Sequence, residues 1–210
     1  EAMDQAVGAV LDELDRLGLS GDTLVVFTSD NGGFGPAVNQ LRGGKGQPFE
    51  GGIRVPLIAR WPGRLPAGAV VETPCIGTDL VPTMAAVGSA PMPEAVDGTD
   101  LMPLWRGEAM AAEPVLVWHF PHYRGDAPPW SAIRVGSSKL IRRYGAAAPG
   151  DRYDLFDLAA DPMEAKDLAD AQPETVAALA ARLDRTLLAQ AAQMPRANPR
   201  FDAAAKPPRR

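Results

Sequence analysis

Residues 23–28 read Thr-Leu-Val-Val-Phe-Thr, an apolar and β-branched run that stops at Ser29-Asp30-Asn31-Gly32-Gly33. Polar and apolar residues do not alternate in this run, which is typical of a strand buried on both faces of a parallel sheet. In open α/β sheets, ligands bind beyond the carboxyl ends of the strands. The pattern therefore predicts an α/β fold in which an acid and an amide, Asp30 and Asn31, lie where ligands bind.

Asp30 and Asn31 supply two hard oxygen donors, which suit Ca²⁺ or Mg²⁺. The alternative is that Asn31-Gly32-Gly33 is only a turn, because asparagine and glycine tolerate positive φ. Downstream, residues 41–46 read Leu-Arg-Gly-Gly-Lys-Gly and place Lys45 among three glycines. Glycine lets backbone amides approach an anion closely, and lysine adds a mobile positive charge. The two features together predict an oxyanion held between a metal ion and Lys45, whereas Lys45 alone would be a solvated loop lysine.

Three segments carry a family resemblance. Their sequences are Thr-Ser-Asp-Asn-Gly-Gly at residues 28–33, Leu-Arg-Gly-Gly-Lys-Gly at 41–46 and Phe-Glu-Gly-Gly-Ile-Arg-Val-Pro at 49–56. In order, spacing and context these segments resemble the type I sulfatases of the alkaline-phosphatase superfamily. The likeness continues at residues 77–83 and 153–168. The resemblance covers nearly all of the chain, and it implies the C-terminal part of a sulfatase with an alkaline-phosphatase-like, mostly parallel sheet.

The resemblance also implies a site and a reaction. Asp30 and Asn31 would be two ligands of an active-site Ca²⁺, with Mg²⁺ the less favoured ion, and Lys45 would contact the sulfate group. A hydrated formylglycine would attack the sulfur of a sulfate ester while the metal and Lys45 neutralise charge on the equatorial oxygens. The substrate would be a sulfated small molecule or a sulfated glycan, and a periplasmic or secreted location would be expected.

The formylglycine of this family arises from a cysteine or serine in a Cys/Ser-x-Pro-x-Arg motif, which this sequence does not match. Cys75, the single cysteine, is followed by Ile-Gly-Thr-Asp, and Ser131 is followed by Ala-Ile-Arg. Cys75 instead fits a small buried hydrophobe. We therefore expect the formylglycine and a pair of metal-binding aspartates upstream of Glu1, and we expect the isolated chain to be inactive. Two alternatives stay open: a phosphomonoester or phosphonate hydrolase of the same superfamily, and a non-catalytic remnant.

Residues 118–124, Trp-His-Phe-Pro-His-Tyr-Arg, contain both histidines of the chain. Aromatic surfaces stack on sugar or aryl rings, and histidine can bind an anionic oxygen or donate a proton to a leaving group. By the resemblance, this stretch reaches the mouth of the active site, so that His119 or His122 would contact the substrate. The alternative is a histidine that only satisfies nearby backbone at the end of a strand.

A shift in composition near residues 107–113, together with the family resemblance, predicts two domains and a tail. Residues 1–106 would form the C-terminal portion of a catalytic α/β domain, 107–194 a small antiparallel sheet packed with a C-terminal helix, and 195–210 a basic, proline-rich tail. The expected helices cover residues 1–17, 78–87, 101–105, 161–168 and 174–193. The expected strands cover residues 23–28, 55–60, 69–73, 115–120, 131–135, 139–144 and 153–158, with a hairpin turn at Gly136-Ser137.

Composition excludes some partners. The chain has 210 residues, of which 46% are hydrophobic, and a net charge of −5. This is enough apolar material for a substantial core, and the acidic balance argues against binding of nucleic acid. No apolar run is long enough to span a membrane, and a single cysteine cannot form a disulfide within the chain. The oligomeric state cannot be predicted from this sequence.

Overall fold

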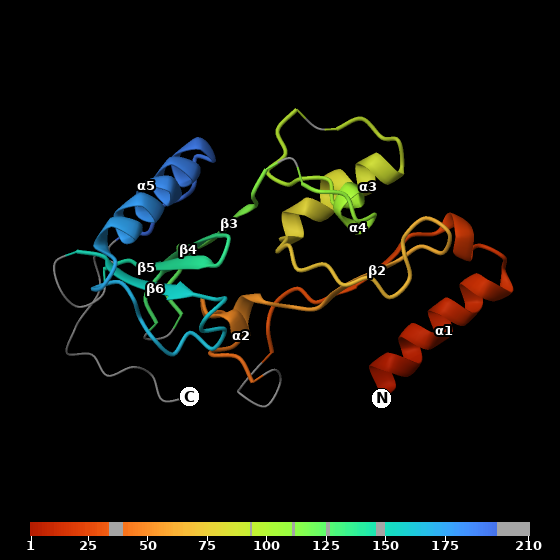
Figure 1. Cartoon of the computed structure of the whole chain (residues 1–210), viewed down its shortest axis with the longest axis horizontal. Coiled ribbons are helices and arrows are strands. Elements are labelled where there is room, and N and C mark those ends of the chain that lie inside the picture. The colour runs from red at the N-terminus through yellow and green to blue at the C-terminus, as the bar shows by residue number, and fades with distance from the viewer. Residues whose placement is uncertain (34–39, 93, 111, 125–126, 146–149, 197–210) are drawn as a thin grey trace. The chain divides into compact units, whose positions relative to one another are not determined.

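The computed structural model describes residues 1–33, 40–92, 94–110, 112–124, 127–145 and 150–196 (Figure 1). The chain divides into two compact units, each built from two segments. Unit 1 comprises residues 1–30 and 55–114, and unit 2 comprises residues 31–54 and 115–210. Most of the predicted tail, residues 197–210, lies outside the described residues. The segment 31–54 therefore leaves unit 1 after Asp30 and packs with the C-terminal part of the chain.

Unit 1 begins with the predicted amphipathic helix, which is confirmed. Helix α1 ends where Gly18 takes φ +69°, a left-handed conformation that glycine adopts without steric cost. The apolar core of unit 1 gathers around the single turn of α4 (Met102–Trp105) and the fully buried Leu101 that precedes it. Val26 and Leu57, from the two strands, pack against this core. The elements of unit 1 are α1 (Ala2–Arg16), η1 (Ser20–Asp22), β1 (Val25–Thr28), β2 (Leu57–Arg60), η2 (Gly77–Asp79), α3 (Leu80–Val87) and α4 (Met102–Trp105).

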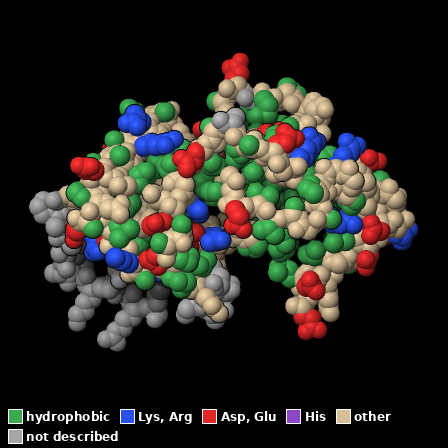
Figure 2. Space-filling model, in the orientation of Figure 1, with side chains coloured by type: hydrophobic (Ala, Val, Ile, Leu, Met, Phe, Trp, Pro, Cys, Tyr) green, Lys and Arg blue, Asp and Glu red, His purple; other side chains and the backbone are tan. Residues whose placement is uncertain are grey.

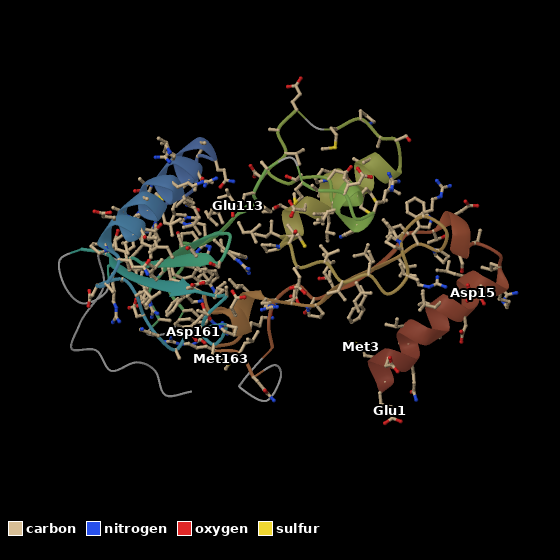
Figure 3. The ribbon with its side chains drawn as sticks, viewed as in Figure 1. Glu1, Met3, Asp15, Glu113, Asp161 and Met163 are labelled. Carbon is tan, nitrogen blue, oxygen red and sulfur yellow. The ribbon has the colours of Figure 1, made fainter. Side chains whose placement is uncertain are left out.

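Strands β1 and β2 pair antiparallel, with Val25 opposite Arg60 and Thr28 opposite Leu57. The predicted parallel sheet is not confirmed, since the strand pairs among the described residues are all antiparallel. The prediction that these strands are buried on both faces is also wrong for this structure. Only one face packs on the α4 core, and Ile58 on the other face is 59% exposed. Met3 of α1, labelled in Figure 3, is exposed as well.

Two further predictions in the loops and turns differ from the structure. Residues 69–73 form no strand, and residues 161–168 form turns rather than a helical piece, with Glu164 at φ +53°. Asp161 and Met163 mark this turn in Figure 3. The buried carboxylate of Asp79, at the start of α3, accepts hydrogen bonds from the amides of Ile76 and Thr99.

Unit 2 contains the predicted antiparallel sheet, which is confirmed. Its four strands follow the order β3-β4-β5-β6, and Gly136 takes φ +56° in the predicted hairpin turn between β4 and β5. The predicted C-terminal helix is confirmed as α5. The elements of unit 2 are α2 (Glu50–Ile53), β3 (Val115–Phe120), β4 (Trp130–Val135), β5 (Ser138–Arg143), β6 (Arg152–Asp157) and α5 (Pro173–Ala189).

The sheet of unit 2 has two differently used faces, because successive side chains of a strand point to opposite sides. On one face, Ile133, Leu140 and Leu155 pack against Leu179, Leu183 and Leu187 of α5. On the other face, Trp130, Ala132, Ile141 and Phe156 pack against Phe49, the residue before α2. We call these the α5 face and the α2 face. Figure 1 shows α5 and α2 on opposite sides of the sheet.

The surface carries both signs of charge. On the side of the molecule seen in Figure 2, Lys and Arg side chains are interspersed with Asp and Glu side chains. Among the described residues, no helix is both long enough and apolar enough to cross a membrane.

The two leucines Leu183 and Leu188 of α5 give a matched test of this packing. Leu183 is fully buried on the α5 face, whereas Leu188 is 81% exposed. We expect Leu183→Ala to lower the free energy of unfolding of unit 2 by about 2–5 kcal/mol, because it leaves a cavity in the core. Leu188→Ala should change it by less than about 0.5 kcal/mol. Hydrogen exchange of the amides of β4 and β5 measures the free energy of unfolding of each variant. Equal losses in the two variants would contradict the packing of Leu183 against the sheet.

Candidate functional site

The predicted metal ligands, Asp30 and Asn31, follow the end of β1 at Thr28. Asp30 is exposed and is the last residue of its segment in unit 1, whereas Asn31 is half-buried and begins the segment 31–54 of unit 2. A carboxylate and an amide oxygen are chemically suited to a hard cation. Within the described part of the chain, no three or more His, Cys, Asp and Glu side chains gather to hold a metal. Asp30 and Asn31 can therefore supply two donors of a coordination shell, but not all of it.

The segment that follows Asn31 runs beside the Lys45 loop, by which we mean residues 41–46. The amide of Gly32 donates to the carbonyl of Gly52 (2.9 Å), and the amide of Lys45 donates to the carbonyl of Gly33 (2.9 Å). Two residues of chain separate Asn31 from the carbonyl that Lys45 binds. The backbone therefore brings Asn31 and Lys45, which are 14 positions apart, into one local structure.

This close backbone packing depends on glycine. A Cβ atom on Gly32 would lie 1.9 Å from the carbonyl oxygen of Gly51, and one on Gly52 would lie 2.3 Å from that of Gln47. Neither distance is possible between real atoms, and the obstructing groups are backbone rather than movable side chains. The glycines of Phe-Glu-Gly-Gly thus let α2 approach the Lys45 loop, a role that the sequence alone did not reveal.

Side chains from the sheet region hold the Lys45 loop through its backbone. The guanidinium of Arg124 donates to the carbonyl of Lys45, and the indole Nε1 of Trp130 donates to the carbonyl of Gly46 (3.2 Å). Within the loop, the amide of Gly44 donates to the side-chain oxygen of Gln47 (3.0 Å). The side chain of Lys45 is exposed. The protein therefore fixes the backbone that carries this ammonium group and leaves the side chain accessible to solvent.

The two histidines lie in different surroundings. His119 stands opposite Ser131 in the sheet and belongs to the α5 face. Its Nδ1 lies 2.6 Å from Ser131 Oγ, and its Nε2 lies 2.9 Å from the carbonyl oxygen of Gln193. Because a carbonyl only accepts, Nε2 carries the proton and Ser131 donates to Nδ1. Both ring nitrogens of His119 are thus engaged within unit 2.

His122 is exposed and lies just beyond the end of β3. Its ring packs edge-on against Phe120, with centroids 5.4 Å apart, and Phe120 stacks on Trp130 at 5.8 Å. Trp130 is the residue whose indole binds the Lys45 loop. Of the two histidines, His122 is therefore the one connected to the Lys45 loop through packed side chains.

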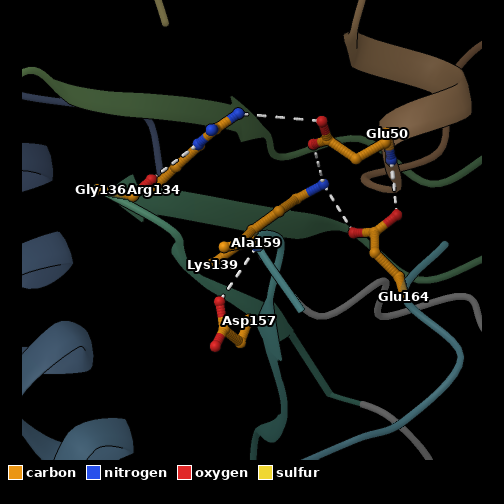
Figure 4. Close-up of polar contacts among 7 residues, drawn as sticks. All are labelled: Glu50, Arg134, Gly136, Lys139, Asp157, Ala159 and Glu164. Carbon is orange, nitrogen blue, oxygen red and sulfur yellow. Dashed lines mark hydrogen bonds and ion pairs between the residues drawn. The ribbon is translucent and has the colours of Figure 1, made fainter. Parts of the chain in front are cut away.

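A buried ionic cluster lies on the α2 face of the sheet and is formed by Glu50, Lys139 and Glu164 (Figure 4). Lys139 and Glu164 are fully buried, and Glu50 is 2% exposed. The Nζ of Lys139 lies 2.9 Å from Glu50 Oε1 and 2.8 Å from Glu164 Oε1. Burial raises the pKa of Glu164, and the charge of Lys139 opposes that rise. Sequence reasoning missed this cluster, and its one local signal is a lysine at the start of an apolar strand.

The sequence of this chain matches those of known proteins. The family model described as Sulfatase matches residues 1–89. Steryl-sulfatase of Mus musculus is 35% identical over 208 residues, a match that covers 82% of this chain and 33% of that protein. Arylsulfatase A of Homo sapiens is 35% identical over 205 residues, with 84% and 40% covered. The chain belongs to the sulfatase family.

Solved structures support the fold of this sulfatase chain. The structure of Ps i-CgsB in complex with k-i-k-neocarrahexaose has a TM-score of 0.76 at 28% identity and covers 88% of this chain and 41% of that one. The phosphonate monoester hydrolase of Agrobacterium radiobacter has a TM-score of 0.69 at 28% identity, with 89% and 39% covered. These likenesses show the alkaline-phosphatase-like fold. The chain spans about a third of the length of the first curated relatives it matches.

Proposed function

We propose that this chain carries part of the active site of a sulfuric ester hydrolase. In this proposal Lys45 binds the sulfate group, and Asp30 and Asn31 hold a Ca²⁺ ion. The observation that carries the proposal is the hydrogen bond from the amide of Lys45 to the carbonyl of Gly33, which joins the lysine loop to the segment that begins at Asn31. An isolated acid-amide turn or an isolated loop lysine would not require this pairing.

The donor chemistry of Asp30 and Asn31 fits calcium better than magnesium. Ca²⁺ accepts six to eight oxygen ligands in flexible geometry, whereas Mg²⁺ requires a near-ideal octahedron. Two adjacent residues on a glycine-rich turn suit the more tolerant ion, with the other ligands coming from elsewhere in the enzyme. When bound, Ca²⁺ would withdraw charge from the sulfate oxygens. A formylglycine nucleophile remains the expectation from family resemblance, and we propose that the isolated chain is inactive without it.

Lys45 acts electrostatically in this proposal. Its ammonium group would offset the negative charge on the nonbridging oxygens of the sulfate ester, and a fixed backbone reduces the reorganisation needed during the reaction. His122 would lie at the edge of the site and contact the substrate or donate a proton to the departing oxygen. We assign no substrate contact to His119, because Ser131 and Gln193 already occupy its ring nitrogens.

The proposed substrate is a sulfated small molecule or a sulfated glycan. Support comes from the names of the relatives, steryl-sulfatase and arylsulfatase A, and from the neocarrahexaose in the complex of Ps i-CgsB. The rings of His122 and Tyr123 are exposed beside the loop that Arg124 anchors. Such aromatic surfaces stack on sugar, sterol or aryl rings.

Lys45→Ala tests the central assignment. In the protein encoded by the complete gene, we expect kcat/KM for a sulfate ester to fall on the order of a hundredfold, because a preorganised charge facing the oxyanion is lost. Lys166→Ala, at an exposed lysine in a turn of unit 2, is the matched control and should leave activity within twofold of the parent. A Lys45→Ala enzyme within twofold of the parent would rule out the proposed role.

Calcium dependence tests the metal ligands. Chelation with EGTA should abolish activity, and added Ca²⁺ should restore it. Asn31→Ala should raise the Ca²⁺ concentration needed for half-maximal activity by about tenfold or more, because one oxygen donor is missing. Asp22→Ala, at an exposed acid before β1, should leave that concentration unchanged. Full activity of the parent in EGTA would contradict the calcium assignment.

A second candidate, a phosphomonoester or phosphonate hydrolase, is favoured by the likeness to the phosphonate monoester hydrolase. The two functions share an oxyanion site. Near neutral pH a phosphate monoester carries one more negative charge than a sulfate monoester, whereas a phosphonate monoester carries the same charge and differs in the atom that is attacked, phosphorus instead of sulfur. Turnover of an aryl sulfate, an aryl phosphate and an aryl phosphonate of the same phenol separates them. We expect the highest kcat/KM with the sulfate; a higher value with either phosphorus ester would favour the second candidate. Absence of all three activities would favour a non-catalytic remnant.

A further inference from the structure

We propose that the buried cluster of Glu50, Lys139 and Glu164 positions Lys45 for catalysis. The cluster would do so by holding the backbone of the Lys45 loop in place. The catalytic part of this inference rests on the function proposed above. The positional part concerns only contacts within unit 2 and can be tested without activity. Lys139 is thus a positioning residue, because it does not itself reach the loop.

The cluster forms hydrogen bonds with the chain on both sides of Lys45. After the loop, the amide of Glu50 donates to Glu164 Oε2 (2.7 Å), and the carboxylate of Glu50 binds Lys139. At the start of the loop, the guanidinium of Arg42 donates to the backbone carbonyl of Glu164 (2.5 Å) and stacks 3.9 Å from the ring centroid of Phe49. Glu164 therefore binds residues on either side of Lys45: it accepts from Arg42 through its backbone carbonyl, and from the amide of Glu50 through the carboxylate that Lys139 contacts.

A short backbone path leads from the cluster to Lys45. Glu50 opens α2, in which the amide of Gly51 donates to the carbonyl of Arg42 (2.8 Å) and the carbonyl of Gly52 accepts from Gly32 (2.9 Å). The next hydrogen bond on this path joins Lys45 to Gly33. With glycines at the contact points, the backbones touch directly. A shift of Glu50 would therefore move the backbone segments 51–52 and 32–33, and with them the position of Lys45.

The composition of the cluster favours a positional role over a purely stabilising one. Well-packed apolar side chains of similar volume often replace a buried ion pair without loss of stability, whereas hydrogen-bonded charges fix direction and distance. Here one ammonium group binds two carboxylates, and Arg134 lies 3.9 Å from Glu50 at the edge of the cluster. Such an arrangement specifies where Glu50 must lie, to a degree that a hydrophobic contact would not.

Hydrogen exchange of the chain tests the positional part. We expect Lys139→Met to speed exchange of the amides of Gly32, Lys45 and Gly51 by at least tenfold, while amides in β3 and β4 stay within twofold of the parent. Lys166→Met is the matched control and should change none of them. Uniform acceleration across unit 2, or no acceleration in the loop, would overturn the proposal.

If Lys139→Met does not fold, Glu164→Gln carries the same test, since it keeps the size of the side chain and an acceptor for the amide of Glu50. It should give the same local pattern of exchange. Uniform acceleration or an unchanged loop in this variant would overturn the proposal equally.

Kinetics of the protein encoded by the complete gene test the catalytic part. We expect Lys139→Met to lower kcat for a sulfate ester at least tenfold in the parent protein. In a protein that already carries Lys45→Ala, the same substitution should lower kcat less than twofold, because Lys139 acts through Lys45. Equal factors in both backgrounds would overturn the catalytic part. A parent with no sulfatase activity would refute the proposed function, while the exchange experiment would still decide whether the cluster positions the loop.

Discussion

The alternation of side chains across the four-stranded sheet is the constraint on which unit 2 depends. One face is apolar and packs on α5, and the other carries Phe49 and the ionic cluster. A register shift of one residue in β5 would exchange Lys139 with Leu140, placing an ammonium group against α5 and a leucine between two carboxylates. Burying an unpaired charge is costly, so the two faces together fix the register of β5. The register in turn places Lys139 between Glu50 and Glu164.

The same alternation separates the two histidines. Three residues apart in sequence, they would be expected to share a role, yet the pairing of His119 with Ser131 turns its ring toward the end of the chain after α5. His122 lies past the strand and packs on Phe120, whose ring stacks on Trp130. The family resemblance offered either histidine as a substrate contact, and this difference in surroundings is why we propose His122 rather than His119.

The parts of this fold that were predictable from sequence are those encoded locally. Strands β3 to β6 lie within one residue of their expected bounds because alternation and the Gly136 turn specify them. The pairing of β1 with β2 could not be read from two apolar runs, since direction depends on partners distant in sequence. The cluster joins residues 89 positions apart, Glu50 and Lys139, and no spacing rule links them. The candidate site residues came from motifs, and their roles stay predictions.

The path of the chain explains why residues so far apart in sequence act together. Asn31 and Lys45 lie between β1 and β2 in sequence, but they belong to the unit that contains β3 to β6. Their backbone is therefore held by groups that come much later in the chain, among them Arg124, Trp130 and Glu164. A motif that is short in sequence thus obtains its geometry from a sheet more than sixty residues downstream. If Lys45 binds sulfate, its position therefore depends on contacts from this later part of the chain as well as on the glycine-rich loop itself.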